Sequence, residues 1–267
     1  MIGEDPLDLG RQIAFVTGAG QGAGRAIALA LARHNAGGIA VNDYYSERAA
    51  AVVAEISALG VPALAVAADV GDYAAVTAAI KAATAAFGPV TLLVNNAGNA
   101  GPTSAIGNGP FFWEGPADDW ERFFRTNVQG VMHCCHAAIP AMVAQRRGRI
   151  VTIVSDAGRM GGARTAAYSA AKAGAAGFVR AIAREAGRFG ITCNAVSLST
   201  LEPQLDPAAK AKFMASEQAK AITSGYVIRR LGKPEDVAGM TVFLCSESAS
   251  WITGQTYPVN GGYSFAL

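Results

Sequence analysis

The chain has 267 residues, of which 51% are hydrophobic and 16% are charged, and its formal net charge is +2. This composition excludes a disordered chain, and the near-neutral charge argues against a nucleic-acid groove or an anionic membrane surface as partner. No apolar run reaches the roughly 18 residues of a membrane span, and the acidic residues near the start argue against a signal segment.

Apolar, strand-like runs alternate with Ala-rich helical runs along the whole chain. Strands that are almost entirely apolar indicate a parallel sheet with helices on both faces, here a single α/β domain spanning 1–267 with a doubly wound, Rossmann-like sheet of about seven strands. In chain order the pattern predicts strand 12–17, helix 22–34, strand 38–43, helix 46–59, strand 62–68, helix 73–87, strand 90–95, helix 118–145, strand 149–155, helix 166–188, strand 191–196, helix 208–222, helix 235–245 and strand 256–259.

A glycine-rich loop follows the first predicted strand and opens the first predicted helix. Its spacing is Gly-x-x-x-Gly-x-Gly, from Gly18 to Gly24. Glycines allow a tight turn and let backbone amides approach a pyrophosphate at the positive end of a helix. A glycine-rich turn without a ligand is the alternative, but the position between strand and helix favours a nucleotide. The candidate cofactor contacts here are Gly18, Gln21, Gly22 and Ala23.

Asp43 stands at the end of the second predicted strand, beyond the glycine loop. A carboxylate at this place accepts hydrogen bonds from an adenosine ribose and repels a 2′-phosphate. The alternative is an ordinary turn residue at a strand end. The position favours the ribose contact, and so NAD over NADP.

Tyr168 and Lys172 are four residues apart on an Ala-rich, helical segment, so their side chains share one face. A free phenol has a pKa of about 10 and is a poor base at neutral pH. An ammonium group beside it is expected to lower the phenol pKa, which is the requirement of a proton-transfer catalyst. A surface pair without function is the alternative for this spacing alone.

The cysteines at 134, 135, 193 and 245 form no Cys-x-x-Cys motif. They are expected to be buried thiols in a reducing, cytoplasmic setting rather than disulfides. Cys134 and Cys135 lie between His133 and His136 inside an apolar helical run, where adjacent residues point in different directions. We expect helix packing here and no metal site.

With these motifs in place, the sequence resembles the short-chain dehydrogenases/reductases over nearly its whole length. Any one motif is weak by itself, but the set occurs in the order typical of the family. The matching positions are Thr17 to Gly24 for the cofactor loop, Asp69 and Val70 for an adenine-contacting pair, Asn95 to Gly98 beside the nicotinamide, Asn127, Ser155, Tyr168 with Lys172, the run from Arg230 to Ala238, and the run from Thr253 to Gly262.

The resemblance implies a role for each catalytic position. Tyr168 corresponds to the general acid/base, and Lys172 to the residue that lowers its pKa and binds the nicotinamide ribose. Ser155 corresponds to the residue that hydrogen-bonds the reacting oxygen, and Asn127 to the one that holds a water near Lys172. Asn96, Ala97 and Gly98 correspond to cofactor contacts. The resemblance further implies a nicotinamide cofactor, which Asp43 indicates is NAD, a small-molecule substrate and a homotetramer.

The chain departs from the family after the sixth strand. The family usually has Pro-Gly followed by a Thr that reaches the nicotinamide amide, whereas this chain has Leu198-Ser199, with Pro203 at the place of the Thr. The segment 198–226 is expected to form a small lid, with Asp206 capping its helix, and an ordinary surface helix is the alternative. The lid, the loop 98–116 and the residues after Ser155 are expected to build the substrate pocket, so the sequence does not identify the substrate.

The function predicted is an NAD(H)-dependent oxidoreductase that interconverts a secondary alcohol and its ketone. The run from Val154 to Arg159 resembles members that act on alicyclic or acyl-thioester alcohols. Two alternatives are kept: an NADPH-dependent 3-oxoacyl-thioester reductase and a non-catalytic nucleotide-binding scaffold. Asp43 argues against the first, and the four filled catalytic positions argue against the second.

Overall fold

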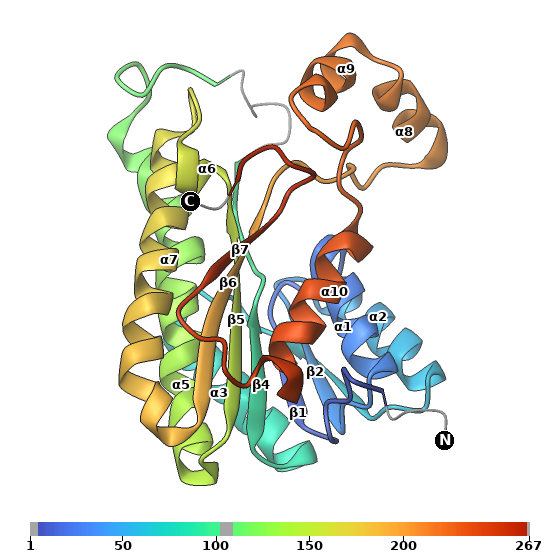
Figure 1. Cartoon of the computed structure of the whole chain (residues 1–267), viewed down its shortest axis with the longest axis vertical. Coiled ribbons are helices and arrows are strands. Elements are labelled where there is room, and N and C mark those ends of the chain that lie inside the picture. The colour runs from blue at the N-terminus through green and yellow to red at the C-terminus, as the bar shows by residue number, and fades with distance from the viewer. Residues whose placement is uncertain (1–4, 102–108, 266–267) are drawn as a thin grey trace.

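A parallel sheet forms the centre of the molecule (Figure 1). The computed structural model describes residues 5–101 and 109–265. The strand order is β3-β2-β1-β4-β5-β6-β7, and every pairing is parallel. The strands are β1 Ile13–Val16, β2 Gly38–Asp43, β3 Ala63–Ala67, β4 Val90–Asn95, β5 Gly148–Ser155, β6 Ile191–Leu198 and β7 Thr256–Val259. The predicted doubly wound fold is confirmed.

Helices cover both faces of this sheet because its strands are apolar on both sides. The first face carries α1 Gly22–Arg33, α2 Ser46–Ala58 and α10 Pro234–Cys245, which share one core with β1, β2, β4 and β6. The second face carries α3 Tyr73–Phe87, α5 Gly130–Gln145 and α7 Ala166–Ala186, packed on a second core. Among the described helices, none combines the length and the apolar character needed to cross a membrane.

The predicted helix 118–145 is not one regular helix. A 3-10 turn at Ala117–Trp120 leads into the short α4 Glu121–Phe124, a π-helical turn at Arg125–Gln129 and then α5. Periodicity of apolar residues does not reveal a π turn, because one extra residue shifts the pattern by only a fraction of a turn. A further short helix that was not predicted, α6 Ala157–Met160, follows β5.

The predicted helix 208–222 is also divided, into α8 Pro207–Met214 and α9 Glu217–Ser224. Asp206 caps α8, as predicted, by accepting two backbone hydrogen bonds at 3.0 Å. The break comes from Ser216, whose hydroxyl accepts the Ala219 amide and so begins a second helix. Both helices stand at the carboxyl ends of the strands, away from the sheet (Figure 1).

The order of the strands places the site. The chain runs outward from β1 through β2 to β3 and then returns to β4 on the other side of β1. The connections that leave β1 and β4 therefore diverge at the carboxyl edge, which is where ligands bind in doubly wound sheets. The glycine loop and the run from Asn96 to Gly98 leave the sheet at this point.

Candidate active site

The glycine loop forms an open cradle at the start of α1. Gly22 has a φ of +53°, a left-handed conformation, and apart from its chain neighbours and the backbone of its own helix no atom lies within 4 Å of where its side chain would begin. Gly24 is required for packing, since a Cβ there would meet the Gly18 carbonyl oxygen at 2.2 Å. Gln21 precedes the helix in an extended conformation and does not cap it with its side chain. The first backbone amides of α1, at the positive end of the helix dipole, thus face the cradle.

Asn96 and Thr17 join the two loops that diverge from β1 and β4. The Asn96 side-chain amide donates to the carbonyl oxygens of Thr17 at 3.0 Å and Gly18 at 2.9 Å. The Thr17 hydroxyl accepts the backbone amides of Asn96 and Ala97, both at 3.0 Å. These bonds fix the cradle against the central strands. Thr17 has this bridging role although the sequence indicated it only as part of a motif.

Asp43 lies next to the cradle, as its place at the end of β2 predicted. Its carboxylate is 6% exposed and accepts the Gly20 amide at 3.0 Å on one oxygen and the Tyr45 amide at 3.1 Å on the other. A carboxylate oxygen has more than one acceptor site, so both oxygens can accept a further hydrogen bond, as from a ribose hydroxyl. The bond to Gly20 couples this carboxylate to the glycine loop.

Asp69 and Val70 follow β3 at the same edge. Asp69 accepts the Gly71 amide at 2.8 Å and forms an ion pair of 2.8 Å with Arg125. Val70 is buried against Gly130, and its carbonyl oxygen lies 2.9 Å from a ring nitrogen of His133. The ion pair with Arg125 joins this loop to the π turn, a contact the sequence did not indicate.

The four predicted catalytic side chains lie around the carboxyl end of β5. Ser155 is the last residue of β5, Tyr168 and Lys172 lie on α7, and Asn127 lies in the π turn. The Lys172 ammonium nitrogen lies 6.0 Å from the centre of the Tyr168 ring. Both this nitrogen and the Asn127 side-chain oxygen approach Gly98, where a Cβ would meet them at 3.2 and 3.1 Å. The structure therefore assembles residues from three separate elements in one place.

The Asn127 side chain is held on both its polar ends. Its amide nitrogen donates to the Asn99 carbonyl at 2.8 Å and to the Phe123 carbonyl at 2.9 Å, and its oxygen accepts the Asn99 amide at 3.2 Å. Asn127 is 1% exposed. The loop after β4 is thereby clamped to the helix beside Lys172.

The expected lowering of the Tyr168 pKa by Lys172 is wrong for the protein by itself. Burial raises the pKa of the Tyr168 phenol, and the neighbouring Ser155 hydroxyl opposes this only in part. The Lys172 ammonium donates to the Ile153 carbonyl oxygen at 2.9 Å instead of to the phenol. Burial also lowers the pKa of Lys172 from 10.5 to about 8. Desolvation outweighs the attraction between these two groups.

A polar cluster directly behind Ser155 was missed by the sequence reasoning. Asp156 is 2% exposed and accepts hydrogen bonds from Ser197 at 2.8 Å, Asn260 at 2.7 Å and Ser264 at 3.1 Å. It also pairs with Arg159 at 3.1 Å. The cluster fastens the segment after β7 to the ends of β5 and β6. An acidic residue next to Ser155 with a basic residue three positions later was the signal available in the sequence.

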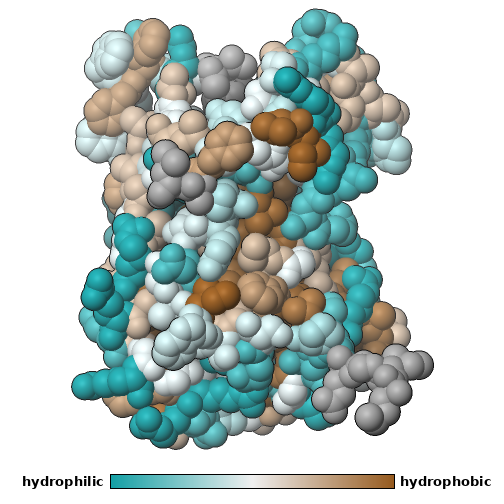
Figure 2. All heavy atoms as spheres, viewed as in Figure 1, coloured by the Kyte–Doolittle hydropathy of each residue, from teal (hydrophilic) through white to brown (hydrophobic). Residues whose placement is uncertain are grey.

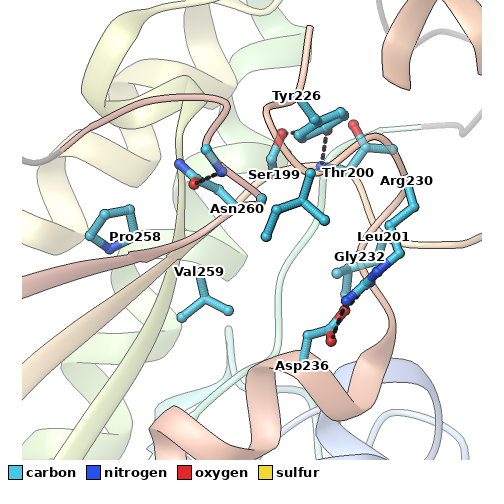
Figure 3. A pocket seen from close by; sticks show the side chains of 13 residues that line it. Ser199, Thr200, Leu201, Tyr226, Arg230, Gly232, Asp236, Pro258, Val259 and Asn260 are labelled. Atoms are coloured by element: carbon cyan, nitrogen blue, oxygen red, sulfur yellow. Dashed lines mark hydrogen bonds and ion pairs between the residues drawn. The ribbon is translucent and has the colours of Figure 1, made fainter. Parts of the chain in front are cut away.

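The segment that replaces Pro-Gly is held by a phenol. The Tyr226 hydroxyl lies 2.6 Å from the Ser199 hydroxyl and accepts the Thr200 amide at 3.0 Å (Figure 3). Below it, Arg230 pairs directly with Asp236, and both residues line a cavity of about 350 Å³ at the base of the lid (Figure 3). Ser199 therefore has a defined structural role that a glycine lacks. Pro203 is in no helix or strand.

A second cavity, of about 130 Å³, opens beside Tyr168 between the loop after β4 and the start of α7. Part of the loop expected to line the substrate pocket, 102–108, lies outside the described residues. The predicted helix packing of the His-Cys-Cys-His run is observed on α5. Cys134 and Cys135 are buried, His133 lies against Val70, and a His136 ring nitrogen lies 2.7 Å from the Tyr73 hydroxyl.

Comparison with known proteins gives consistent results. A family model described as Enoyl-(Acyl carrier protein) reductase matches residues 18–264. The 3-oxoacyl-(acyl-carrier-protein) reductase FabG of Staphylococcus aureus is 38% identical over 250 residues, which are 93% of this chain and 96% of that protein. The 2-dehydro-3-deoxy-L-rhamnonate dehydrogenase (NAD(+)) of a Sphingomonas species is 36% identical, covering 93% of this chain and 94% of that protein. A solved 7 alpha-hydroxysteroid dehydrogenase, complexed with NADH and 7-oxo glycochenodeoxycholic acid, has a TM-score of 0.86 and 33% identity, and the match covers 98% of each chain.

Proposed function

The chain belongs to the short-chain dehydrogenase/reductase family and is an oxidoreductase acting on CH-OH groups, and from that premise we propose that it interconverts a secondary alcohol and its ketone with NAD(H). The observation that carries the proposal is the meeting of Ser155, Tyr168, Lys172 and Asn127 beside the glycine cradle. The relatives differ in substrate, so the substrate class rests on this chain's own pocket.

The residues present fit a dinucleotide. The cradle at Gly22 is open, the start of α1 has no side-chain cap, and the Asp43 carboxylate faces the loop at the expected place. In the proposed arrangement the loop residues Gly18, Gln21, Gly22 and Ala23 hold the pyrophosphate and Asp43 holds the adenosine ribose. The remaining proposed contacts are Asp69 and Val70 to the adenine, Asn96, Ala97 and Gly98 along the dinucleotide, and Tyr168 and Lys172 at the nicotinamide ribose.

Bound there, the nicotinamide supplies or accepts the hydride. The protein's own residues manage the charge and the proton on the reacting oxygen. Tyr168 donates a proton to the ketone oxygen, and its raised pKa keeps that proton in place at neutral pH. Ser155 offers a second hydroxyl that orients the same oxygen. In the reverse direction Tyr168 must first lose its proton, so we expect alcohol oxidation to accelerate as the pH rises.

The preference for NAD over NADP follows from Asp43. A 2′-phosphate beside this carboxylate creates a like-charge contact, which typically costs several kcal/mol. One observation favours the alternative, an NADPH-dependent 3-oxoacyl-thioester reductase: Arg48 lies next to Gly20 and is the nearby basic group. Its guanidinium stacks 4.3 Å above the Tyr45 ring. Because the Gly20 amide fixes the Asp43 carboxylate beside the glycine loop, we retain NAD as the proposed cofactor.

We further propose that the segment 198–226 covers the substrate, that the protein is a homo-oligomer, and that it acts in the cytoplasm. The position of α8 and α9 over the carboxyl edge supports the lid. Partly exposed apolar residues on the second half of α5 and in the turn after α7, including Ile139, Val143 and Phe189, support a subunit contact. All four cysteines are buried and free of disulfides, which agrees with a reducing compartment.

The decisive experiment is an oxidation assay with NAD⁺ over a set of secondary alcohols, using Tyr168→Phe as the matched variant. The variant keeps the ring and loses the proton, so we expect turnover to fall about 100-fold or more while NADH still binds. NADH binding is measured by fluorescence titration. Retention of more than about a tenth of the wild-type turnover would show that Tyr168 is not the acid/base.

A further inference from the structure

Aromatic side chains gather on the segment that leads from β4 into α5. The rings of Phe111 and Trp113 stack with their centres 4.9 Å apart, and those of Phe112 and Trp120 stack 5.0 Å apart. Trp113 is 78% exposed and Phe112 is 49% exposed. With Phe123, these residues are called the aromatic cluster below. Large rings exposed together in this way mark a binding surface, since scattered single rings are the norm on a protein surface.

The aromatic cluster is continuous with the predicted catalytic group. Phe111, Phe112, Trp120 and Phe123 line the cavity of about 130 Å³ that Tyr168 also lines. The Phe123 ring stands edge-on to the Tyr168 ring, with centres 6.2 Å apart. In Figure 1 this segment is the green loop at the upper left, at the same end of the molecule as α6. Tyr168 lines the same cavity. In a substrate whose ring occupies this cavity, the carbon that carries the reacting oxygen is therefore only a few bonds from the ring.

A guanidinium group borders the same cavity. The Arg164 guanidinium lies 4.2 Å above the Phe111 ring and donates to the Gly109 carbonyl at 2.6 Å. No ion pair joins Arg164 to a carboxylate within the described part of the chain. Arg122 differs, because it pairs with Asp119 at 3.5 Å. A guanidinium has five N–H donors, so Arg164 keeps donors for a carboxylate beyond the one that it gives to Gly109.

We propose that the substrate is a secondary alcohol, or the corresponding ketone, that has an aromatic ring on or next to the carbinol carbon and a carboxylate a few bonds away. The ring enters the aromatic cluster and the carboxylate binds Arg164. This inference rests on the proposed function for the reaction, but the binding of ring and carboxylate can be tested without any reaction. The rival occupant of the cluster is a second copy of the chain, which does not explain a cation placed beside a cavity that reaches Tyr168.

The binding test uses 3-phenylpropanoate, which has the ring and the carboxylate and no group to oxidise. The variants are Trp120→Leu, which removes a ring, and Arg164→Asn, which removes the cation and suits the left-handed φ of +64° at this position. Trp251→Leu is the control for the ring, since Trp251 is 99% exposed outside the cavity. Arg11→Asn is the control for the cation, since Arg11 has a similar φ of +57° and lies outside the cavity.

Calorimetry should show saturable binding of 3-phenylpropanoate. The affinity should fall about tenfold in Trp120→Leu and in Arg164→Asn, because each loses one ring contact or one charged hydrogen bond, and it should be unchanged in both controls. In turnover, 3-hydroxy-3-phenylpropanoate should have a higher kcat/KM than 3-hydroxybutanoate, which lacks the ring, and than 1-phenylpropan-1-ol, which lacks the carboxylate. Arg164→Asn should abolish only the advantage over 1-phenylpropan-1-ol.

Each outcome decides one question. If 3-phenylpropanoate does not bind, or binds equally well to all variants, the aromatic-carboxylate inference is wrong. The Tyr168→Phe assay then still tests the proposed reaction by itself. Binding without any turnover supports the inference and contradicts the proposed reaction. If Trp120→Leu changes the oligomeric state, measured by sedimentation, and not the binding, the aromatic cluster is a subunit contact and the inference is wrong.

Discussion

Replacement of Lys172 by Met is expected to stabilise the protein while it abolishes activity. Lys172 is 6% exposed, and burial lowers its pKa from 10.5 to about 8. Below pH 8 the ammonium is charged in both folded and unfolded chains, so the whole burial penalty is present, about 3 kcal/mol. Met has a similar length and no charge. It forfeits the hydrogen bond from the charged ammonium to the Ile153 carbonyl, worth about 2 kcal/mol, which leaves a net gain of about 1 kcal/mol at pH 7.

The sign of the pH dependence follows from the lowered pKa. Between about pH 8 and pH 10.5 the unfolded chain binds the Lys172 proton more tightly than the folded chain does, so the stability of the unsubstituted protein rises with pH in this window. The advantage of Lys172→Met should therefore shrink above pH 8 and disappear as the pH approaches 10.5. A gain that grew with pH would contradict the burial argument.

The assay is urea unfolding without cofactor at pH 7 and pH 9.5, with turnover measured alongside. Lys81→Met is the control, because Lys81 is exposed on α3 and its replacement should change stability by less than about 0.5 kcal/mol. If Lys172→Met is less stable than the unsubstituted protein at pH 7, the ammonium is not penalised by burial, and the contact with Ile153 dominates.

Three other substitutions test separate parts of the structure. Asp43→Ala should raise kcat/KM with NADPH about tenfold or more relative to NADH, because it removes the like charge; an unchanged preference in steady-state kinetics would assign cofactor choice to other residues such as Arg48. Asp156→Asn leaves Arg159 and hydroxyl donors without their carboxylate, so it should lower the free energy of unfolding, measured in urea, by about 3 kcal/mol. Asp119→Asn, which breaks an exposed ion pair, should have little effect, and equal effects of the two substitutions would argue against the buried cluster. Phe213→Ala, in the proposed lid, should raise KM for a bulky alcohol several-fold and leave NAD⁺ affinity unchanged, and a similar KM for large and small alcohols would return α8 to a purely structural role.

The amino-acid sequence by itself determined the layered sheet and the position of the candidate site. Apolar strands that alternate with Ala-rich helices can be buried on both sides in a parallel sheet that helices cover on both faces. The structure has this sheet, with the predicted strands. Local chemistry likewise fixed the glycine cradle and the cap at Asp206, because a turn, a helix start and a capping bond each depend on a few neighbouring residues. Asp43 was placed correctly because the end of a strand is a local feature.

The tertiary structure decided what depends on partners distant in sequence. Asp156 binds Asn260 and Ser264, more than one hundred positions away, and nothing near it in the sequence names those partners. The same holds for Lys172, whose local pairing with Tyr168 predicted a lowered phenol pKa. Burial by the whole fold raises the pKa of the Tyr168 phenol, and the Lys172 ammonium donates to the Ile153 carbonyl oxygen instead. Helical spacing fixes which side chains share a face, but the free energy of a charge depends on everything that surrounds it, and only the assembled chain supplies those surroundings.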